Sequence, residues 1–259
     1  MASSLVGSRV ERKEDKRFLT GKGRYTSDIN IANQTYAIFI RSPHARAKIK
    51  KIDTSKALKA QGVVNILTGE DIAKDKIGGL IAGWAIRSED GSEMKCPTNP
   101  PLAKDNVNFV GDPVAVVFAE TLDEAKAASE LVKVEYKVLK AVTNLEETMN
   151  SESIHEGIDK NLCYDWLLGD RQKVKEAFEK ADKIIKLDIT NNRLIPNAME
   201  PRACVVDYNT ASEEITCYTT SQNPHLSRLI MSAFGGVAPE NKLRVVAPDV
   251  GGGFGSKIN

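Results

Sequence analysis

The sequence lacks closely spaced cysteines and histidines, the residues that an iron–sulfur cluster or a structural zinc ion would need as ligands. Its 259 residues include 4 cysteines and 3 histidines. The cysteines form no C-x-x-C pair and lie far apart, at Cys96, Cys163, Cys204 and Cys217. Cysteine-ligated clusters and structural zinc sites depend on short spacings between ligands. The sequence therefore predicts neither kind of site in this chain, and we expect the cysteines to be buried, inert thiols.

The sequence also lacks an excess of either charge and any long apolar run. Its 36 basic residues are balanced by 35 acidic residues, which removes the electrostatic argument for binding nucleic acid or an anionic membrane. Apolar stretches such as Val114–Ala119 are far shorter than the roughly 20 residues that span a bilayer. Residues 1–17 have no apolar signal-peptide core. We therefore expect a cytoplasmic protein with no nucleic-acid partner and no membrane insertion.

Helix-like and strand-like segments alternate without a regular βαβ rhythm, which is typical of α+β architecture. Thr121 begins an S/T-x-x-E capping box ahead of a helix with one apolar face. Residues 132–138 then alternate apolar and charged side chains, as a half-buried strand does. Residues 78–101, rich in Gly, Pro, Ser and Asn, predict a long loop. These signals predict a first domain over 1–140, a polar connector over 141–168 and a second domain over 169–259.

The second domain is expected to contain two helices and a β-hairpin. Asp170 can cap a helix whose apolar stripe includes Val174 and Phe178. Asn223 predicts the N-cap of another helix, which ends at Gly235. Strands are expected over 183–190, 204–208, 214–219 and 242–247, with the second and third paired as a hairpin.

A glycine run occupies Gly251 to Gly255, interrupted only by Phe254. Glycine is concentrated where the backbone takes positive φ or closely approaches a ligand. A P-loop would need glycine before Lys257, where this chain has Ser256. A G-x-G-x-x-G fingerprint that starts at Gly251 would also need glycine at position 256. The residues alone leave open a flexible tail or a cofactor loop, whereas these mismatches disfavour an independent nucleotide-binding protein.

Six short segments occur in the order and rough spacing found in one known family. They are Arg17–Asp28, Arg41–Ala45, Val110–Val114, Asn197–Arg202, Thr220–His225 and Gly251–Gly255. Together they resemble the molybdenum-binding large subunit of the xanthine oxidase and aldehyde oxidase family, of which the chain would be the N-terminal portion. Within that family, the segments most resemble the carbon monoxide dehydrogenase large-chain type. The resemblance covers essentially the whole chain.

The resemblance implies an N-terminal α/β hammerhead domain, followed by the first, incomplete part of a molybdopterin-binding α+β domain. It implies that Gln222 is a catalytic residue that reaches an oxygen ligand of molybdenum, with no direct metal ligand in this chain. It further implies that Gln222 contacts the cofactor together with four residues of the glycine run, Gly252, Gly253, Phe254 and Gly255. The chemistry agrees, because a glutamine amide can donate a hydrogen bond to a metal-bound oxygen. Glycines let backbone N–H groups approach an anion without an intervening Cβ.

The resemblance also implies an activity and a set of partners. The chain would be an oxidoreductase component that uses molybdenum–molybdopterin, in its cytosine dinucleotide form, to oxidise carbon monoxide, an aldehyde or an N-heterocycle. Electrons would pass to a 2Fe–2S small subunit and an FAD-binding medium subunit. Aldehyde- and purine-oxidising members often have glutamate where this chain has Ile258, which favours the carbon monoxide dehydrogenase-like branch.

No residue here matches the family's general base or its loops that hold the pterin, which lie further along the family's sequence. We therefore expect the chain to be inactive alone and to need the remaining part of the large subunit. The alternative is a truncated or split chain whose hammerhead domain has a non-catalytic role in assembly or interaction.

Overall fold

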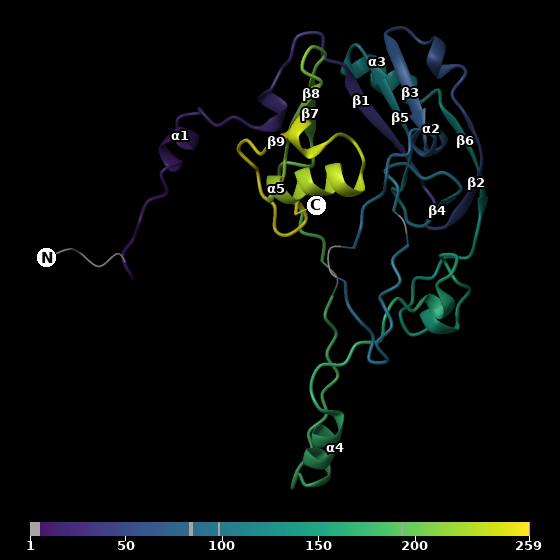
Figure 1. Ribbon diagram of the computed structural model, residues 1–259, viewed down its shortest axis with the longest axis vertical. Helices are drawn as coiled ribbons and strands as arrows, with labels where there is room; N and C mark the ends of the chain where they lie inside the picture. The colour runs from purple at the N-terminus through teal and green to yellow at the C-terminus, as the bar shows by residue number, and fades with distance from the viewer. Residues whose placement is uncertain (1–5, 83–84, 98, 193, 259) are drawn as a thin grey trace, which may run out of the picture. The chain divides into compact units, whose positions relative to one another are not determined.

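The computed structural model describes residues 6–82, 85–97, 99–192 and 194–258. The chain divides into two units, each traced in sequence colours in Figure 1. The glycine-loop unit comprises Met1–Ala32, Ile195–Ala233 and Ala238–Asn259. The two-sheet unit comprises Asn33–Leu194 and Phe234–Val237.

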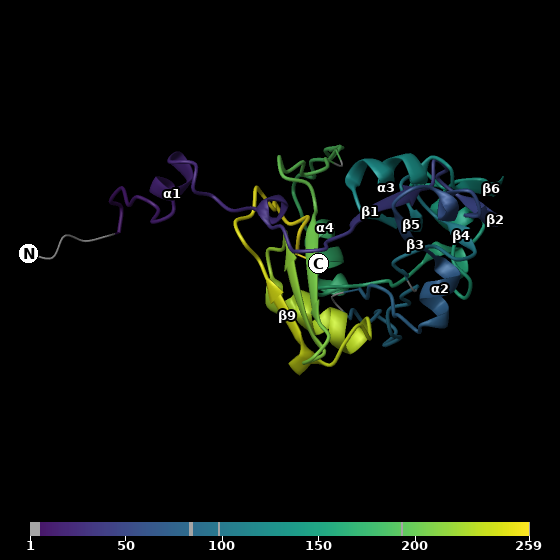
Figure 2. The ribbon, with the colours of Figure 1, turned by 90° about the horizontal axis from the view of Figure 1, so that it is seen from above.

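The first sheet of the two-sheet unit is antiparallel, in the order β1 (Tyr36–Arg41), β5 (Pro113–Ala119) and β3 (Val63–Thr68). Its central strand, β5, is the most apolar and the most buried of the three. Helix α3 (Leu122–Ser129) lies alongside this sheet, as Figure 2 shows. The predicted cap of α3 is confirmed, because the Thr121 hydroxyl accepts a hydrogen bond from the Glu124 N–H at 3.2 Å. Val117 and Ala128 are fully buried in the core between sheet and helix.

The second sheet has the order β4 (Asn106–Val107), β2 (Ala47–Asp53) and β6 (Lys133–Val138), again antiparallel. In β6 the predicted apolar face is confirmed at Val134 and Tyr136, which pack against a buried cluster that includes Ala47 and Val107, whereas Val138 is exposed. Helix α2 (Gly69–Lys74) follows β3 and begins with a reciprocal cap between Thr68 and Asp71.

The predicted loop over 78–101 has neither helices nor long strands among its described residues, and isolated bridges join Leu80 to Asn99 and Arg87 to Glu93. Helix α4 (Arg171–Glu179) begins directly after its predicted N-cap, Asp170. The Asp170 side chain accepts a hydrogen bond from the Lys173 N–H at 3.0 Å. The apolar stripe of α4 remains exposed at Val174 and Phe178.

The strand predicted over 183–190 is wrong. These residues form no ladder with any described strand, and the side chains of Ile185, Leu187 and Ile189 are 84%, 77% and 78% exposed. An alternating apolar pattern predicts a strand only where another strand offers hydrogen-bond partners. No described segment of this chain supplies that partner to 183–190.

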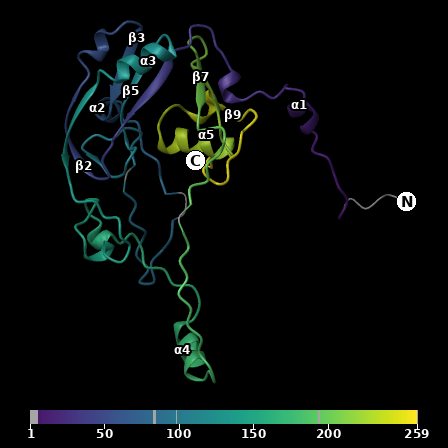
Figure 3. The same cartoon turned by 180° about the vertical axis from the view of Figure 1, so that it is seen from behind.

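The glycine-loop unit is built on a third sheet, in the order β7 (Cys204–Asn209), β8 (Glu214–Thr219) and β9 (Leu243–Val246). Strands β7 and β8 form the predicted antiparallel hairpin, and β9 runs parallel to β8. Helix α5 (Pro224–Leu229) contacts β9, as Figure 3 shows from behind, and continues as a π-helical turn over Ile230–Phe234. The short helix α1 (Asp15–Leu19) belongs to the amino-terminal segment of this unit.

The expectation of buried thiols holds for Cys217 and is wrong for Cys96 and Cys204, which are exposed. Cys217 lies on the central strand β8, and its burial raises the pKa of its thiol to about 11. No helix among the described residues is both long enough and apolar enough to cross a membrane.

Candidate functional site

Gln222 lies in the short connection between the central strand β8 and helix α5. The two residues before it, Thr220 and Ser221, are buried, and the Ser221 hydroxyl accepts from the Asn223 N–H at 3.0 Å. Asn223 then caps α5 by accepting from the Leu226 N–H at 3.2 Å. The backbone of Gln222 is therefore held on both sides by a strand end and a helix start.

The side-chain oxygen of Gln222 is bound to the glycine run. Its Oε1 accepts hydrogen bonds from the backbone N–H of Gly255 at 2.9 Å and of Lys257 at 3.2 Å. The Gln222 backbone N–H donates to the Lys257 carbonyl at 2.8 Å. Two N–H donors can face only the oxygen of an amide, so this arrangement fixes which way the side chain is turned. The Nε2 group is left as a donor, and no described residue accepts a hydrogen bond from it.

The run itself has a backbone that few other residues could adopt. Gly252 and Gly255 have φ of 102° and 83°, and Phe254 has φ of 52°, in the left-handed region that disfavours bulky residues. A Cβ on Gly253 would lie 2.5 Å from the Cγ, Cδ and Oε1 atoms of Gln222. Glycine at position 253 is therefore what allows the Gln222 side chain to lie against the run.

Several backbone donors of the run have no partner within the described part of the chain. The N–H groups of Gly251, Gly255, Ser256 and Lys257 all donate to oxygens. The N–H groups of Gly252, Gly253 and Phe254 donate to no oxygen of the described residues. Successive N–H groups in a turn of this kind form a concave surface that attracts anions.

Three residues outside the predicted site, Glu200, Arg202 and Lys257, hold the ends of the run. The Gly251 N–H donates to Glu200 Oε2 at 2.6 Å, and Lys257 Nζ donates to the Glu200 carbonyl at 2.7 Å. The Lys257 side chain is only 2% exposed. The guanidinium of Arg202 also donates to the Ser256 carbonyl. The only signal in the sequence is the Glu-Pro-Arg segment, which contains two charged residues that read equally well as a surface pair.

Asp249, two residues before the run on the β9 side, is held by the amino-terminal segment. Its carboxylate accepts two hydrogen bonds from the Arg17 guanidinium, one of them at 2.6 Å, and one from the Arg24 N–H at 2.7 Å. These bonds, with the Arg17 bond as the largest effect, hold the pKa of Asp249 below its ordinary value. The segment Arg17–Asp28 and the glycine run therefore form one connected structure.

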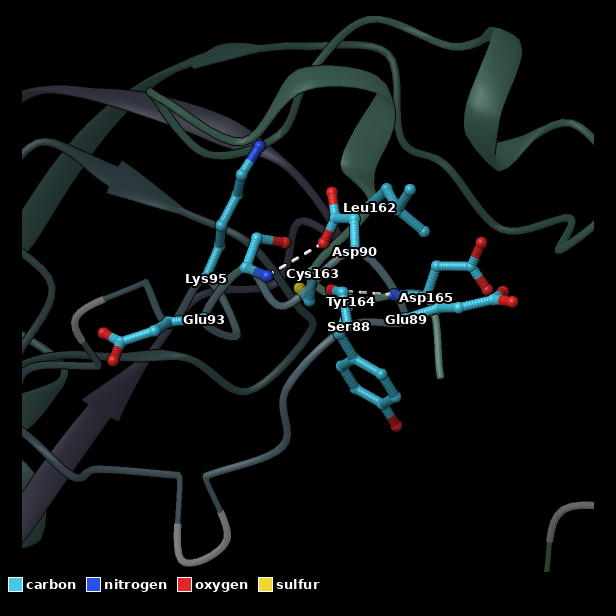
Figure 4. Close-up of a pocket in the computed structure, with 10 residues that line it drawn as sticks. Ser88, Glu89, Asp90, Glu93, Lys95, Leu162, Cys163, Tyr164 and Asp165 are labelled. Carbon is cyan, nitrogen blue, oxygen red and sulfur yellow. Dashed lines mark hydrogen bonds between the residues drawn. The ribbon is translucent and has the colours of Figure 1, made fainter. Parts of the chain in front are cut away.

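The two-sheet unit contains a separate, acidic pocket of about 470 Å³, drawn in Figure 4. It lies between the loop that contains Glu89 and Asp90 and the segment Leu162–Asp165. The Lys95 N–H donates to the Cys163 carbonyl at 2.9 Å across it. Among the described residues there is no group of three or more His, Cys, Asp or Glu side chains that could hold a metal ion.

Two family models match the chain in succession. Residues 20–140 match the aldehyde oxidase and xanthine dehydrogenase a/b hammerhead domain, and residues 154–259 match the molybdopterin cofactor-binding domain. The chain belongs to the family of molybdopterin-binding xanthine dehydrogenases and aldehyde oxidases. The family resemblance and the α+β fold class predicted from the sequence are thereby confirmed.

Similar proteins include large subunits of other enzymes. The chain is 35% identical to the nicotine 6-hydroxylase large subunit of Paenarthrobacter nicotinovorans, over 99% of this chain and 30% of that protein. It is 33% identical to the carbon monoxide dehydrogenase large chain of Afipia carboxidovorans, over 98% of this chain and 32% of that protein. Its structure matches quinoline 2-oxidoreductase from Pseudomonas putida 86 with a TM-score of 0.82 and 31% identity, over 97% of this chain and 31% of that one. The chain thus spans about a third of the length of these relatives.

The contact between Gly253 and Gln222 predicts a strong coupling between the two positions. Gly253→Ala should lower the free energy of unfolding by about 1–3 kcal/mol, because the new Cβ overlaps the Gln222 side chain. The cost should fall sharply in a Gln222→Ala background, since the overlap is then removed. Urea denaturation of the two single variants and the double variant measures this coupling. Gly23→Ala is the control, because its Cβ would meet only movable ring atoms at 3.1 and 3.2 Å. Additive costs at positions 253 and 222 would contradict the described packing.

The ion pair at Asp249 predicts a dependence of stability on pH. Because the folded-state pKa of Asp249 is lowered from 3.8, its stabilising effect is fully present above that value and is lost as the pH falls through the folded-state pKa. Asp249→Asn should therefore be less stable than the unmodified chain at pH 7, and the difference should shrink below about pH 3.8. Denaturation curves over this pH range test the prediction, with the exposed Asp207→Asn as control. A difference that stays constant with pH would show that the ion pair contributes nothing.

Proposed function

We propose that this chain is the part of a molybdenum hydroxylase large subunit that contacts the molybdenum cofactor through Gln222 and residues 252–255. The observation that carries this proposal is the set of donors on one loop. Gln222 Nε2 and the N–H groups of Gly252, Gly253 and Phe254 have no acceptor among the described residues. A loop with unpartnered N–H donors is suited to a ligand that presents hydrogen-bond acceptors.

The donor set fits an anionic cofactor. Molybdopterin presents phosphate and thiolate groups, and its molybdenum presents oxygen ligands, all of which accept hydrogen bonds. Gly255 has open space beside it, because a Cβ there would meet no atom within 4 Å. Phe254 is 73% exposed, so its ring is available to cover a bound group. When bound, the molybdenum centre would supply two-electron oxidation of the substrate.

The chain's own residues would bind and orient this group. Gln222 would hold an oxygen on the metal through its Nε2–H, with its carbonyl end fixed by Gly255 and Lys257. The N–H groups at 252–254 would bind anionic oxygens, and the glycines would keep Cβ atoms out of the way. The role of Gln222 as a catalytic residue is part of this proposal.

The substrate class and the partners are proposed from the relatives. The names of three relatives refer to nicotine, carbon monoxide and aldehydes. These names support the proposal that the substrate is carbon monoxide, an aldehyde or an N-heterocycle. We further propose a cytosine dinucleotide form of the cofactor, an FAD-binding medium subunit, a 2Fe–2S small subunit and a cytoplasmic location. The remaining part of the large subunit is also a proposed partner, since the chain spans 30% and 32% of two such relatives.

A non-catalytic role in assembly is the second candidate, and one observation favours it. Ile185, Leu187 and Ile189 lie outside any helix or strand and are at least 77% exposed. Such a segment can add a strand to the sheet edge of another polypeptide. The catalytic role requires the free N–H donors of the glycine loop to bind the cofactor, whereas the assembly role does not.

In a complete enzyme, Gln222→Ala should reduce turnover far more than it reduces molybdenum content. Loss of one donor aimed at charge that develops during a reaction typically costs about 100- to 1,000-fold in kcat. The cofactor would keep its other contacts, so its occupancy should change little. Turnover per bound molybdenum is the measurement, and Gln172→Ala, an exposed glutamine on α4, is the matched control. Unchanged turnover at full molybdenum loading would remove Gln222 from the site.

Residues 1–259 produced alone in a host that makes the cofactor should be inactive and should not retain it. The donors of the loop would then contact the cofactor on one side only, and ordering residues without further packing costs about 1–2 kcal/mol each. Elemental analysis for molybdenum and fluorescence analysis for pterin measure retention. Co-production with a polypeptide equivalent to the rest of a relative's large subunit should restore it. Near-stoichiometric molybdenum in the chain alone would contradict this expectation.

A further inference from the structure

The ammonium group of Lys257 is buried beside the glycine run, although lysine is rarely buried without partners. Its Nζ donates to the Glu200 carbonyl at 2.7 Å and lies 3.4 Å from Glu200 Oε2. The side chains of Lys257 and Glu200 are 2% and 15% exposed. A buried charge pair is strongly favoured only in one geometry, because leaving either charge without a partner is costly.

The backbone of Lys257 both donates a hydrogen bond to Gln222 and accepts one from it. Its N–H donates to Gln222 Oε1 at 3.2 Å, and its carbonyl accepts from the Gln222 N–H at 2.8 Å. The position of the Lys257 side chain therefore affects the position of the peptide groups that hold Gln222. A shift of the ammonium group would move the donor that fixes the side-chain amide.

Glu200 binds the opposite end of the run. Its Oε2 accepts from the Gly251 N–H at 2.6 Å, and its backbone N–H donates to the Gly251 carbonyl at 3.3 Å. A Cβ on Gly251 would lie 2.5 Å from the Glu200 Cβ, so a side chain at position 251 would overlap Glu200. One residue, Glu200, thus contacts both the first glycine of the run and the lysine that follows it.

We propose that Glu200 and Lys257 are positioning residues that hold both ends of residues 251–257, so that Gln222 presents its Nε2 away from the loop. The identity of the group that Nε2 meets rests on the proposed function above. The positioning itself is a property of this chain and can be tested without a cofactor. Positioning would explain why this charge pair is buried, although neither the Glu200 carboxylate nor the Lys257 ammonium group bonds to Gln222.

Amide hydrogen exchange of the chain, followed by NMR, provides the test. The N–H groups of Gly255 and of residue 257 report on the bonds to Gln222 Oε1, and the N–H groups of β8 report on the stability of the sheet. Lys257→Met should raise exchange at 255 and 257 at least about tenfold relative to β8. Lys242→Met is the matched control, because Lys242 Nζ also donates to a backbone carbonyl, that of Ser212 at 2.7 Å, in the same unit. It should leave exchange at 255 and 257 unchanged.

A second pair of variants separates positioning from a general loss of packing. Glu200→Gln keeps an oxygen that can accept from Gly251 but leaves the Lys257 ammonium without its charge partner, so exchange at 255 and 257 should rise by less than in Glu200→Ala. Glu200→Ala removes that oxygen and should give the same large increase as Lys257→Met. If Lys257→Met does not fold, the difference in exchange at 255 and 257 between Glu200→Gln and Glu200→Ala tests the proposal by itself.

Two results would overturn the proposal. One is an increase of less than about twofold at 255 and 257 in both Lys257→Met and Glu200→Ala. The other is an equal increase in the loop and in β8, which would make the pair a contributor to overall stability only. Neither result depends on molybdenum, so a failure of the proposed function would appear in turnover and metal content and leave this measurement unaffected.

Discussion

The hydrogen bonds that Gln222 Oε1 accepts from the N–H groups of Gly255 and Lys257 are the interaction on which the site depends. They fix the direction of a side-chain amide that would otherwise be free to turn. They can form only because Gly253 has no Cβ, since one would lie 2.5 Å from the Gln222 side chain. They also require the run to reverse direction, which the positive φ at Gly252 and Gly255 provides.

The rest of the glycine-loop unit holds this interaction in place. Strand β8 lies between β7 and β9, so the chain enters Thr220 and Ser221, just before Gln222, from the central strand of a three-stranded sheet. Asp249 is bound by Arg17 and Arg24 before the run begins, and Glu200 and Lys257 are bound to each other at its ends. The donors at 252–254 are thus the part of the run that the described chain does not use. This division between bound ends and free donors agrees with a loop that receives an anionic group.

Much of this arrangement could be predicted from sequence, and the exceptions have physical causes. The hairpin of β7 and β8, the Asn223 cap and the alternation in β6 follow from local patterns, and the structure has all three. The absence of a strand over 183–190 could not be predicted, because a strand needs a partner and the apolar pattern says nothing about where that partner is. The Glu200–Lys257 pair also could not be predicted from the sequence, since the two residues are 57 positions apart and charged residues are ordinarily exposed. The placement of Gln222 beside the run depended on the family resemblance, because no local pattern joins residues 33 and 35 positions apart.

The most direct test of the account is a crystal structure of this chain assembled with the rest of a large subunit and the molybdenum cofactor. The account predicts that Gln222 Nε2 lies within hydrogen-bond distance, about 2.7–3.2 Å, of an oxygen bound to molybdenum. It also predicts that Oε1 keeps its bonds to Gly255 and Lys257, and that the N–H groups of residues 252–254 face acceptors of the cofactor. A structure in which Gln222 is turned so that Nε2 faces the loop, or in which the cofactor lies away from residues 252–255, would contradict the central claim.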